Sequence, residues 1–367
     1  MAYNRKQRLN DNIKAIETAF ILDREQRTPT ARERLLLERY CGFGGLKCIL
    51  NPARELVDAV HWAKSDLELF APTVELHRLI RENSKNESEY KQLMDSLKQS
   101  VLTAFYTPSA VTEALTDVLK EYQIIPEKVL EPSAGIGAFV DSVLDNNPKA
   151  DIMAFEKDLL TGKILRHLHP EQKVRIEGFE KIEKPFNDYF DLAISNIPFG
   201  DVAVFDSSYT AMKGMRALVT RRIHNYFFVK ALDTVRDGGL VAFITSQGVL
   251  NAKNNSAARF MMLYHADLVS AIRLPNNLFT ENANTEVGSD LIILQKNTQK
   301  ESLRGDDNLL DTVYNDENRI PTNNYFLEHP ERIIHTTAKL DTDPFGKPAM
   351  IYTHEDGVEG IAEDLRK

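Results

Sequence analysis

The residues best suited to chemistry in this sequence form one short turn at positions 195–200, which reads Ser-Asn-Ile-Pro-Phe-Gly and directly follows an apolar run. The Asn196 side chain and the Ile197 carbonyl are hydrogen-bond acceptors, and together they suit the two hydrogens of a planar NH2 group. Pro198 stiffens the turn, and the ring of Phe199 is able to stack on a heterocycle. The turn therefore predicts a site that binds a planar amine.

A second polar turn, 131–137, reads Glu-Pro-Ser-Ala-Gly-Ile-Gly and follows an earlier apolar run. Gly135 and Gly137 let the backbone turn tightly and approach a ligand closely. A dinucleotide fingerprint would need a third glycine at Val140, so a ligand without a diphosphate fits better. Glu131 stands where the predicted strand ends, in a position to meet a cationic amino group.

Two further residues follow the next predicted strands. Glu156 comes about 20 residues after the glycine turn, a spacing that suits an acid gripping ribose hydroxyls. A helix-capping or surface acid is the alternative for Glu156. Phe179 is either the wall of an adenine pocket or a core side chain, and the sequence favours neither.

A basic segment follows the Asn-containing turn. No acidic residue lies between Asp206 and Asp233, and the net charge of −9 does not exclude a local nucleic-acid footprint. A solvated helix or loop face is the alternative. The residues that we predict to contact nucleic-acid phosphates are Lys213, Arg216, Arg221 and Arg222.

Short apolar runs alternating with helical patterns position these turns. This alternation predicts an α/β fold with a parallel sheet covered on both faces, and ligands of such sheets bind at the carboxyl ends of the strands. We divide the chain into a helical N-terminal region (1–100), a catalytic core (101–297) and an irregular C-terminal extension (298–367). The predicted strands are 128–131, 151–156, 173–177, 190–195, 240–245, 268–273 and 290–295.

The bulk properties narrow the class of protein. The 367 residues are 43% hydrophobic and 27% charged, as in globular proteins, and contain no 18-residue apolar run. The N-terminus lacks the apolar core of a signal peptide, and two cysteines are too few for a disulfide scaffold. We therefore expect a cytoplasmic protein without a membrane partner and without a metal site.

Taken together, the turns resemble those of class I S-adenosylmethionine-dependent methyltransferases of the N6-adenine DNA type, with the motif order of the gamma-type enzymes. The likeness extends to a subfamily of phages, plasmids and conjugative elements whose members are often fused to helicases. It implies a Rossmann-like fold with a seven-stranded, mostly parallel sheet. It also implies S-adenosylmethionine as cofactor, DNA as partner, a role in restriction-modification, and a helicase or further domains of a longer polypeptide as a second partner.

The resemblance assigns roles residue by residue. The segment 104–108 (Ala-Phe-Tyr-Thr-Pro) matches the motif that closes over the methionine end of the cofactor. The cofactor-binding residues that it implies are Tyr106, Thr107, Pro108, Glu131, Ser133, Gly135, Gly137, Glu156, Lys157, Phe179 and Glu180. The catalytic turn that it implies is Asn196, Ile197, Pro198 and Phe199.

The sequence departs from the family pattern at two positions. Ile197 stands where a proline is usual, and Gly178 stands where many relatives carry an aspartate, whose place Glu180 is able to take. Two rival functions remain open. The same acceptors suit methylation of RNA or of a protein glutamine amide, and a non-catalytic DNA-binding or anti-restriction module would keep the same fold.

Overall fold

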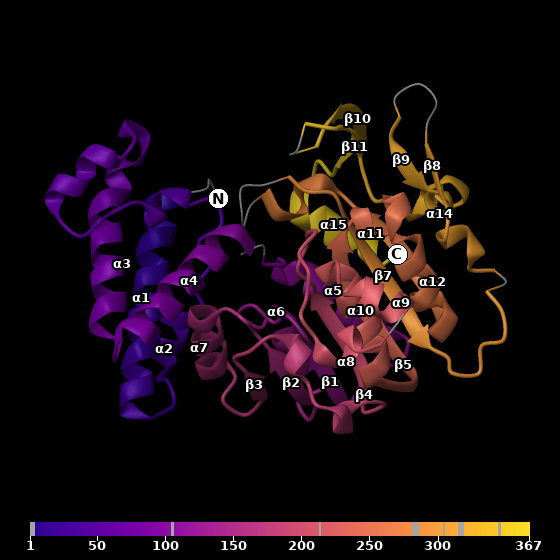
Figure 1. Cartoon of the computed structure of the whole chain (residues 1–367), viewed down its shortest axis with the longest axis horizontal. Coiled ribbons are helices and arrows are strands. Elements are labelled where there is room, and N and C mark those ends of the chain that lie inside the picture. The colour runs from indigo at the N-terminus through magenta and orange to yellow at the C-terminus, as the bar shows by residue number, and fades with distance from the viewer. Residues whose placement is uncertain are drawn as a thin grey trace.

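A seven-stranded sheet runs through the centre of the larger part of the molecule (Figure 1). The computed structural model describes residues 4–103, 106–212, 214–280, 286–303, 305–314, 319–343 and 346–367. The strand order is β3-β2-β1-β4-β5-β7-β6, and β7 alone among the seven runs antiparallel to the others. The strands are β1 Lys128–Glu131, β2 Asp151–Phe155, β3 Lys173–Arg175, β4 Phe190–Asn196, β5 Val235–Ser246, β6 Ala266–Leu274 and β7 Ser289–Lys296.

This topology confirms the predicted fold class, since each of the seven predicted strands is present in the one sheet. The largest difference is β5, which begins at Val235 rather than at Leu240. Between Val235 and Leu240, residues 236–239 are polar or glycine and are mostly exposed, so they give no apolar signal.

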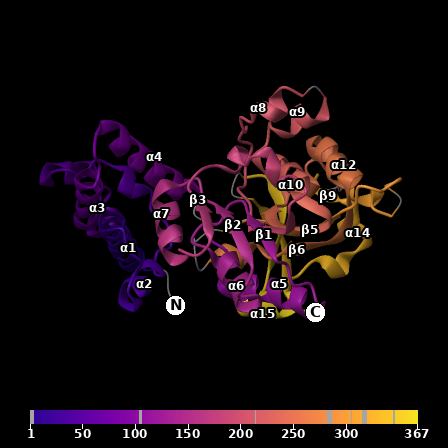
Figure 2. The same ribbon diagram turned by 90° about the horizontal axis from the view of Figure 1, so that it is seen from below.

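Helices cover both faces of the sheet, as Figure 2 shows. Alternate strand residues face opposite sides: Val241 and Phe243 pack beneath α10 and α12, whereas Ala242 and Ile244 pack against α5, α6 and α15. The longer helices are α1 Arg5–Glu25, α3 Phe70–Glu82, α4 Glu87–Thr103, α5 Ser109–Glu121, α6 Ala138–Asn146, α7 Leu159–Leu168, α10 Ile223–Thr234, α12 Ser256–His265 and α15 Gly357–Leu365. The shorter ones are α2 Ala31–Leu37, α8 Ser207–Thr210, α9 Met215–Val219, α11 Gly248–Asn251 and α14 Asn324–Glu328.

The N-terminal helices α1 to α4 form a separate apolar core that packs on α7 (Figure 1). A capping box begins α2, with Thr30 and Glu33 exchanging hydrogen bonds. Asp23 of α1 accepts hydrogen bonds from Lys163, Arg166 and His167 of α7. The helical region is thus fastened to the core by apolar packing and by charge-assisted hydrogen bonds, which are stronger than neutral ones.

The chain after residue 298 is more regular than the sequence analysis expected. It forms two antiparallel strand pairs, β8 Thr312–Tyr314 with β9 Pro321–Asn323 and β10 Thr337–Thr342 with β11 Pro348–Thr353. The final helix, α15, buries one apolar face against α5. Every residue of β10 is exposed, which is why no apolar alternation marked this hairpin in the sequence.

Candidate active site

The two polar turns meet at the point where the strand order of the sheet reverses, between the adjacent strands β1 and β4. Pairing between them ends at Leu130 and Ala193, whereas β4 continues to Asn196, which lies in register with Ile244 of β5. Above that point, the Ser195 hydroxyl donates to the carbonyl of Ser133 at 3.3 Å. Ligands of open α/β sheets bind at such a switch point, so the two turns share one site.

Ile197 stands where a proline is usual, and it has a backbone N–H that proline lacks. This N–H is hydrogen-bonded. Its backbone N–H donates to the Ile244 carbonyl at 3.0 Å, which extends the β4–β5 ladder by one hydrogen bond. The side chain is 1% exposed and belongs to the core beneath α10. Proline has no N–H and would lose this bond, so isoleucine anchors the turn by a different means.

Phe199 ends the turn 196–199, which we call the acceptor half of the site because it is predicted to hold the base that accepts the methyl group. Its half-buried ring meets the buried ring of Phe279 edge to face, with centroids 6.3 Å apart. Three polar atoms at the ends of β5 and β7 are buried and have no hydrogen-bond partner among the described residues: Thr245 Oγ1, Gln247 Nε2 and Ser289 Oγ. Buried polar atoms are nearly always hydrogen-bonded, so this end of the sheet is suited to a polar ligand.

The glycine turn is shaped by residues far away in sequence. Gly135 has φ +57°, and a Cβ there would lie 2.9 Å from the ring of Tyr106. The Tyr106 hydroxyl lies 3.2 Å from Thr161 Oγ1 on α7. Gly137 has φ +95°, and a Cβ there would collide with the ring of His169. Both positions therefore require glycine for backbone and for space.

Glu131 is a buried carboxylic acid at the tip of β1. It is 2% exposed, and its Oε2 has no partner within the described part of the chain. Burial, together with the nearby Glu156, raises the pKa of Glu131 well above its usual value. Thr107 Oγ1 is also buried without a partner there. A cation bound beside Glu131 would favour its ionised form and offset its desolvation.

Glu156 is held by two backbone donors. Its Oε2 accepts from the Gly135 N–H at 2.8 Å, and its Oε1 accepts from the Asp158 N–H at 2.7 Å. Each oxygen keeps a second lone pair for a ligand hydroxyl. Burial and the charge of Asp158 raise the pKa of Glu156 to about 8, against the effect of the backbone donors.

The second departure from the family pattern is filled by a neighbour. A Cβ at Gly178 would collide with the carboxylate of Glu180, so Glu180 occupies the space of a side chain at position 178. The Lys157 ammonium lies 3.8 Å from the same carboxylate. Phe179 is 1% exposed and packs among Phe155 and two aromatic residues of α10. It is a core side chain here, and its contact with an adenine ring stays a prediction.

The predicted basic contacts are not equivalent in the structure. Arg216 donates to both oxygens of Asp233, at 2.6 and 2.9 Å, and so anchors α9. Arg222 pairs with Asp201 at 3.0 Å, and Arg221 is exposed. Lys213 lies outside the described residues. Phosphate contact by these residues stays a prediction, with Arg216 already neutralised by Asp233.

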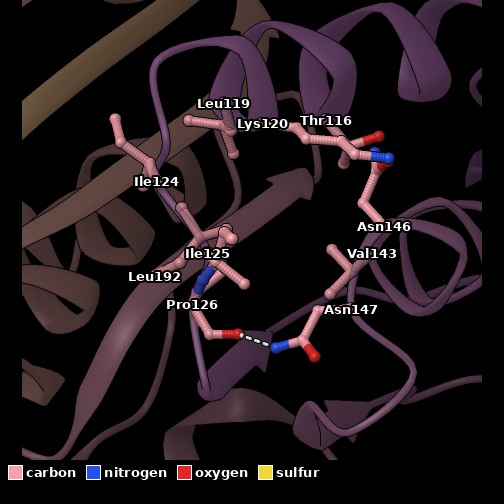
Figure 3. A pocket seen from close by; sticks show the side chains of 10 residues that line it. All are labelled: Thr116, Leu119, Lys120, Ile124, Ile125, Pro126, Val143, Asn146, Asn147 and Leu192. Carbon is pink, nitrogen blue, oxygen red and sulfur yellow. Dashed lines mark hydrogen bonds between the residues drawn. The ribbon is translucent and has the colours of Figure 1, made fainter.

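Of two cavities, the larger is lined in part by Tyr106, Thr107 and Pro108, which belong to the predicted cofactor-binding residues. A small apolar hollow of about 20 Å³ lies near the amino end of β1, where Asn147 donates to the Pro126 carbonyl (Figure 3). A larger cavity of about 600 Å³ is lined by residues 106–110, by α6 and by 38–41. Among the described residues, no cluster is suited to a metal ion, and no helix is long and apolar enough to cross a membrane.

The strand order and the position of the polar turns define a class I S-adenosylmethionine-dependent methyltransferase. The family described as N-6 DNA Methylase matches residues 88–352, more than half of the chain, and the chain belongs to this family. This confirms the resemblance stated above, and its cofactor is S-adenosylmethionine.

Two curated relatives match parts of the chain. "Defense against restriction protein B" of Escherichia phage P1 is 29% identical over 201 residues, which are 53% of this chain and 8% of that protein. The Type II methyltransferase M.XamI of Xanthomonas campestris pv. amaranthicola is 25% identical over 173 residues, which are 44% of this chain and 33% of that enzyme. The chain thus spans a third or less of each relative.

Among solved structures, the DNA-bound Type ISP restriction-modification enzyme LlaBIII is similar with a TM-score of 0.45. The two are 13% identical, and the match covers 98% of this chain and 27% of that enzyme.

The residues at the switch point fit S-adenosylmethionine. The buried Glu131 carboxyl suits the cationic end of the cofactor, and the bare Gly135 leaves room for close approach. Glu156 has two oxygens oriented by backbone donors, which suit ribose hydroxyls. The sequence predicted these three residues through local spacing, and their contact with the cofactor stays a prediction. It did not reveal Thr161, His169 or Gln247, whose roles depend on contacts between distant segments.

Proposed function

We propose that this protein transfers the methyl group of S-adenosylmethionine to the N6 amino group of adenine in DNA. The observation that carries the proposal is the placement of Asn196 at the tip of β4, beside the glycine turn and fixed by the Ile197–Ile244 hydrogen bond. Membership of the N-6 DNA Methylase family supports the same reaction.

In the proposed mechanism, the chain's own residues orient the acceptor. The Asn196 side chain and the Ile197 carbonyl accept the two N6 hydrogens, which turns the nitrogen lone pair toward the cofactor. Phe199 stacks on the base from the rim of the site. S-adenosylmethionine supplies an electrophilic methyl group on a sulfonium. Positioning and preorganised dipoles account for the rate, and the transfer is direct and in line.

The proposed substrate is a base turned out of the duplex, because the N6 of a paired adenine is out of reach of the buried turn. DNA is the proposed partner, bound in part through the exposed Arg221. A helicase or further domains of a longer polypeptide are a second proposed partner. We propose this second partner because the matched segment makes up only 8% of the phage relative.

Incubation with labelled S-adenosylmethionine and mixed-sequence DNA, followed by nucleoside analysis, tests the reaction. We expect label in N6-methyladenine with the wild type and with the exposed control Asn187→Ala, and its loss with Asn196→Ala. Label that survives Asn196→Ala would contradict the site. Transfer to RNA or to a glutamine-containing peptide in place of DNA would favour the rival substrates, and failure to bind S-adenosylhomocysteine would favour a non-catalytic module.

A further inference from the structure

His224 is a buried side chain that the proposed reaction does not use. It lies in the first turn of α10 and is 3% exposed. Neither ring nitrogen has a hydrogen-bond partner among the described residues. Burial is the main cause that lowers the pKa of His224 to about 4, so the ring is neutral and offers one donor and one acceptor. A buried imidazole with both nitrogens unmet is suited to a polar ligand.

The same turn of α10 is uncapped. Its N-cap residue, Arg222, makes no side-chain cap, and the first turn contains no acidic residue. Among the described residues, no backbone carbonyl outside α10 accepts from the N–H groups of residues 223–225. The partial positive charge of a 12-residue helix therefore points out of α10 unopposed by a cap.

Arg222 is fixed beside this helix end. Its Nη1 donates to Oδ1 of both Asn254 and Asn255 at 2.7 Å, two neutral acceptors that hold the guanidinium without neutralising it. Its anionic partner is Asp201, whose carboxylate lies 3.0 Å from Nε and has a side chain that is 73% exposed. Asp201 follows the catalytic turn by only a few residues, so the helix end adjoins the acceptor half of the site.

His224 follows the N-cap residue Arg222 by two positions, so both residues belong to the start of α10. The charge of Arg222 lowers the pKa of the imidazole, and the charge of Asp201 raises it. The ring therefore lies within the field of both ends of the Arg222–Asp201 ion pair. An unmet donor, an uncapped helix start and a fixed guanidinium thus belong to the same end of α10, and an exposed carboxylate pairs with that guanidinium.

We infer that the start of α10 binds a backbone phosphate of the DNA strand that carries the target base. His224 donates one hydrogen bond to it, the N–H groups of the first helical turn donate others, and Arg222 supplies the charge. Asp201 occupies the place of the phosphate when DNA is absent and moves into solvent when DNA binds. The inference rests on the proposed function for its ligand, since phosphate as such is the chemistry that the site selects.

The variant His224→Phe tests the inference, since it keeps the shape of a buried ring and removes both nitrogens. It should fold at least as stably as the wild type, because it removes two unmet polar atoms. The matched control is His77→Phe, which removes a partnered buried histidine whose Nε2 lies 2.8 Å from the Ile49 carbonyl. We expect His77→Phe to lower the melting temperature and to leave DNA affinity unchanged.

The first readout is the affinity for a DNA duplex, measured by fluorescence anisotropy at several salt concentrations. His224→Phe should weaken binding about ten- to a hundredfold, the range for one hydrogen bond to a charged group. Arg222→Gln should weaken binding and lower the salt slope by about one. Unchanged affinity and unchanged slope in both variants would overturn the inference.

The second readout locates the phosphate. Methylphosphonates, which carry no charge, replace the phosphates around the target adenine one at a time. The wild type should lose affinity at one position where His224→Phe loses little more, and equal losses in both proteins at every position would exclude the contact. A different result would assign His224 to the edge of a base and would also overturn the proposal. In that result, methylphosphonate and His224→Phe lower the DNA affinity additively at every phosphate, and the effect of His224→Phe depends on the identity of one base.

The third readout separates the sources of phosphate. In proton NMR titrations, the His224 ring signals should shift and its pKa should rise on addition of DNA. Inorganic phosphate that causes the same shift shows a general anion site, and a shift with DNA alone shows a site for the backbone; no shift with either contradicts the inference. If the affinity loss at one phosphate and the NMR shift of His224 appear although no N6-methyladenine forms, the proposed reaction fails and the phosphate site stands. If methylation occurs without them, the phosphate site alone fails.

Discussion

Replacing Ile197 by proline would restore the usual family residue, and we nevertheless predict a less stable protein. The substitution removes the N–H that donates to the Ile244 carbonyl at 3.0 Å, and it shortens a side chain that is 1% exposed. A lost partner of a buried carbonyl costs about 1–3 kcal/mol, and the lost apolar contact adds about 1 kcal/mol. The stiffer unfolded chain offsets about 0.4–1 kcal/mol.

The matched control is Ile197→Val, which keeps the N–H and removes one buried carbon. Its expected cost is about 0.5–1.5 kcal/mol. Ile197→Pro should therefore unfold about 1–2 kcal/mol more easily than Ile197→Val, which follows from the bond energies above. Urea unfolding followed by far-ultraviolet circular dichroism measures the difference between the midpoints.

A second measurement separates stability from chemistry. Both variants keep the carbonyl at position 197, so Asn196-dependent methyl transfer should persist in each below its unfolding midpoint. A proline variant as stable as the valine variant, or more stable, would refute the argument that isoleucine anchors the turn through the ladder. Loss of transfer in Ile197→Val as well would show that the side chain itself, rather than the backbone, touches the substrate.

Three more predictions concern the cofactor half and the sheet. Because the pKa of Glu156 is about 8 and only the ionised form accepts from two hydroxyls, calorimetric affinity for S-adenosylhomocysteine should rise about tenfold from pH 7 to pH 9, and the rise should be smaller in Glu156→Gln. Gly135→Ala should weaken both folding and cofactor binding, because the added Cβ collides with the ring of Tyr106 and also strains the backbone. The control is Gly305→Ala, at φ +94° in open space. It should show only the backbone strain, a loss of about 1–3 kcal/mol in thermal unfolding. Arg273→Leu should destabilise the fold by about 3–5 kcal/mol, since it leaves the buried Asp290 unpaired, and Asp290→Leu added to it should recover part of that loss. Full additivity of those two substitutions would contradict the buried pair.

Much of the fold was predictable because the relevant signals are local. The apolar runs that became β1, β2 and β4 are short and bounded by polar turns, and parallel order places their ends together. The sequence therefore placed Glu131 and Asn196 correctly at strand ends, and their roles in the reaction stay predictions. The helix α15 was missed although Val358, Ile361 and Leu365 recur at helical spacing, because the surrounding segment is polar.

What the sequence could not show depends on contacts between distant residues. Gly137 faces His169, and the ring of Tyr106 is fixed through Thr161 on another helix. Arg216 carries the same charge as Arg221, yet a carboxylate 17 positions away neutralises it. Spacing within one segment does not encode these pairings, so a basic run identifies charge without identifying which charge is available to a ligand.

The two departures from the family pattern follow one physical rule. At Ile197 the lost rigidity of a proline is replaced by a hydrogen bond to the neighbouring strand, and at Gly178 the lost side chain is replaced by the carboxylate of Glu180. At position 197 the backbone N–H of the new residue supplies the anchor, and at position 178 a carboxylate reaches the required place from a different residue. The site is therefore defined by where its acceptors lie rather than by which residues stand in the motif. It follows that Glu180→Ala should weaken cofactor binding, whereas Gly178→Asp should do so only while Glu180 is present, because the two carboxylates compete for one space.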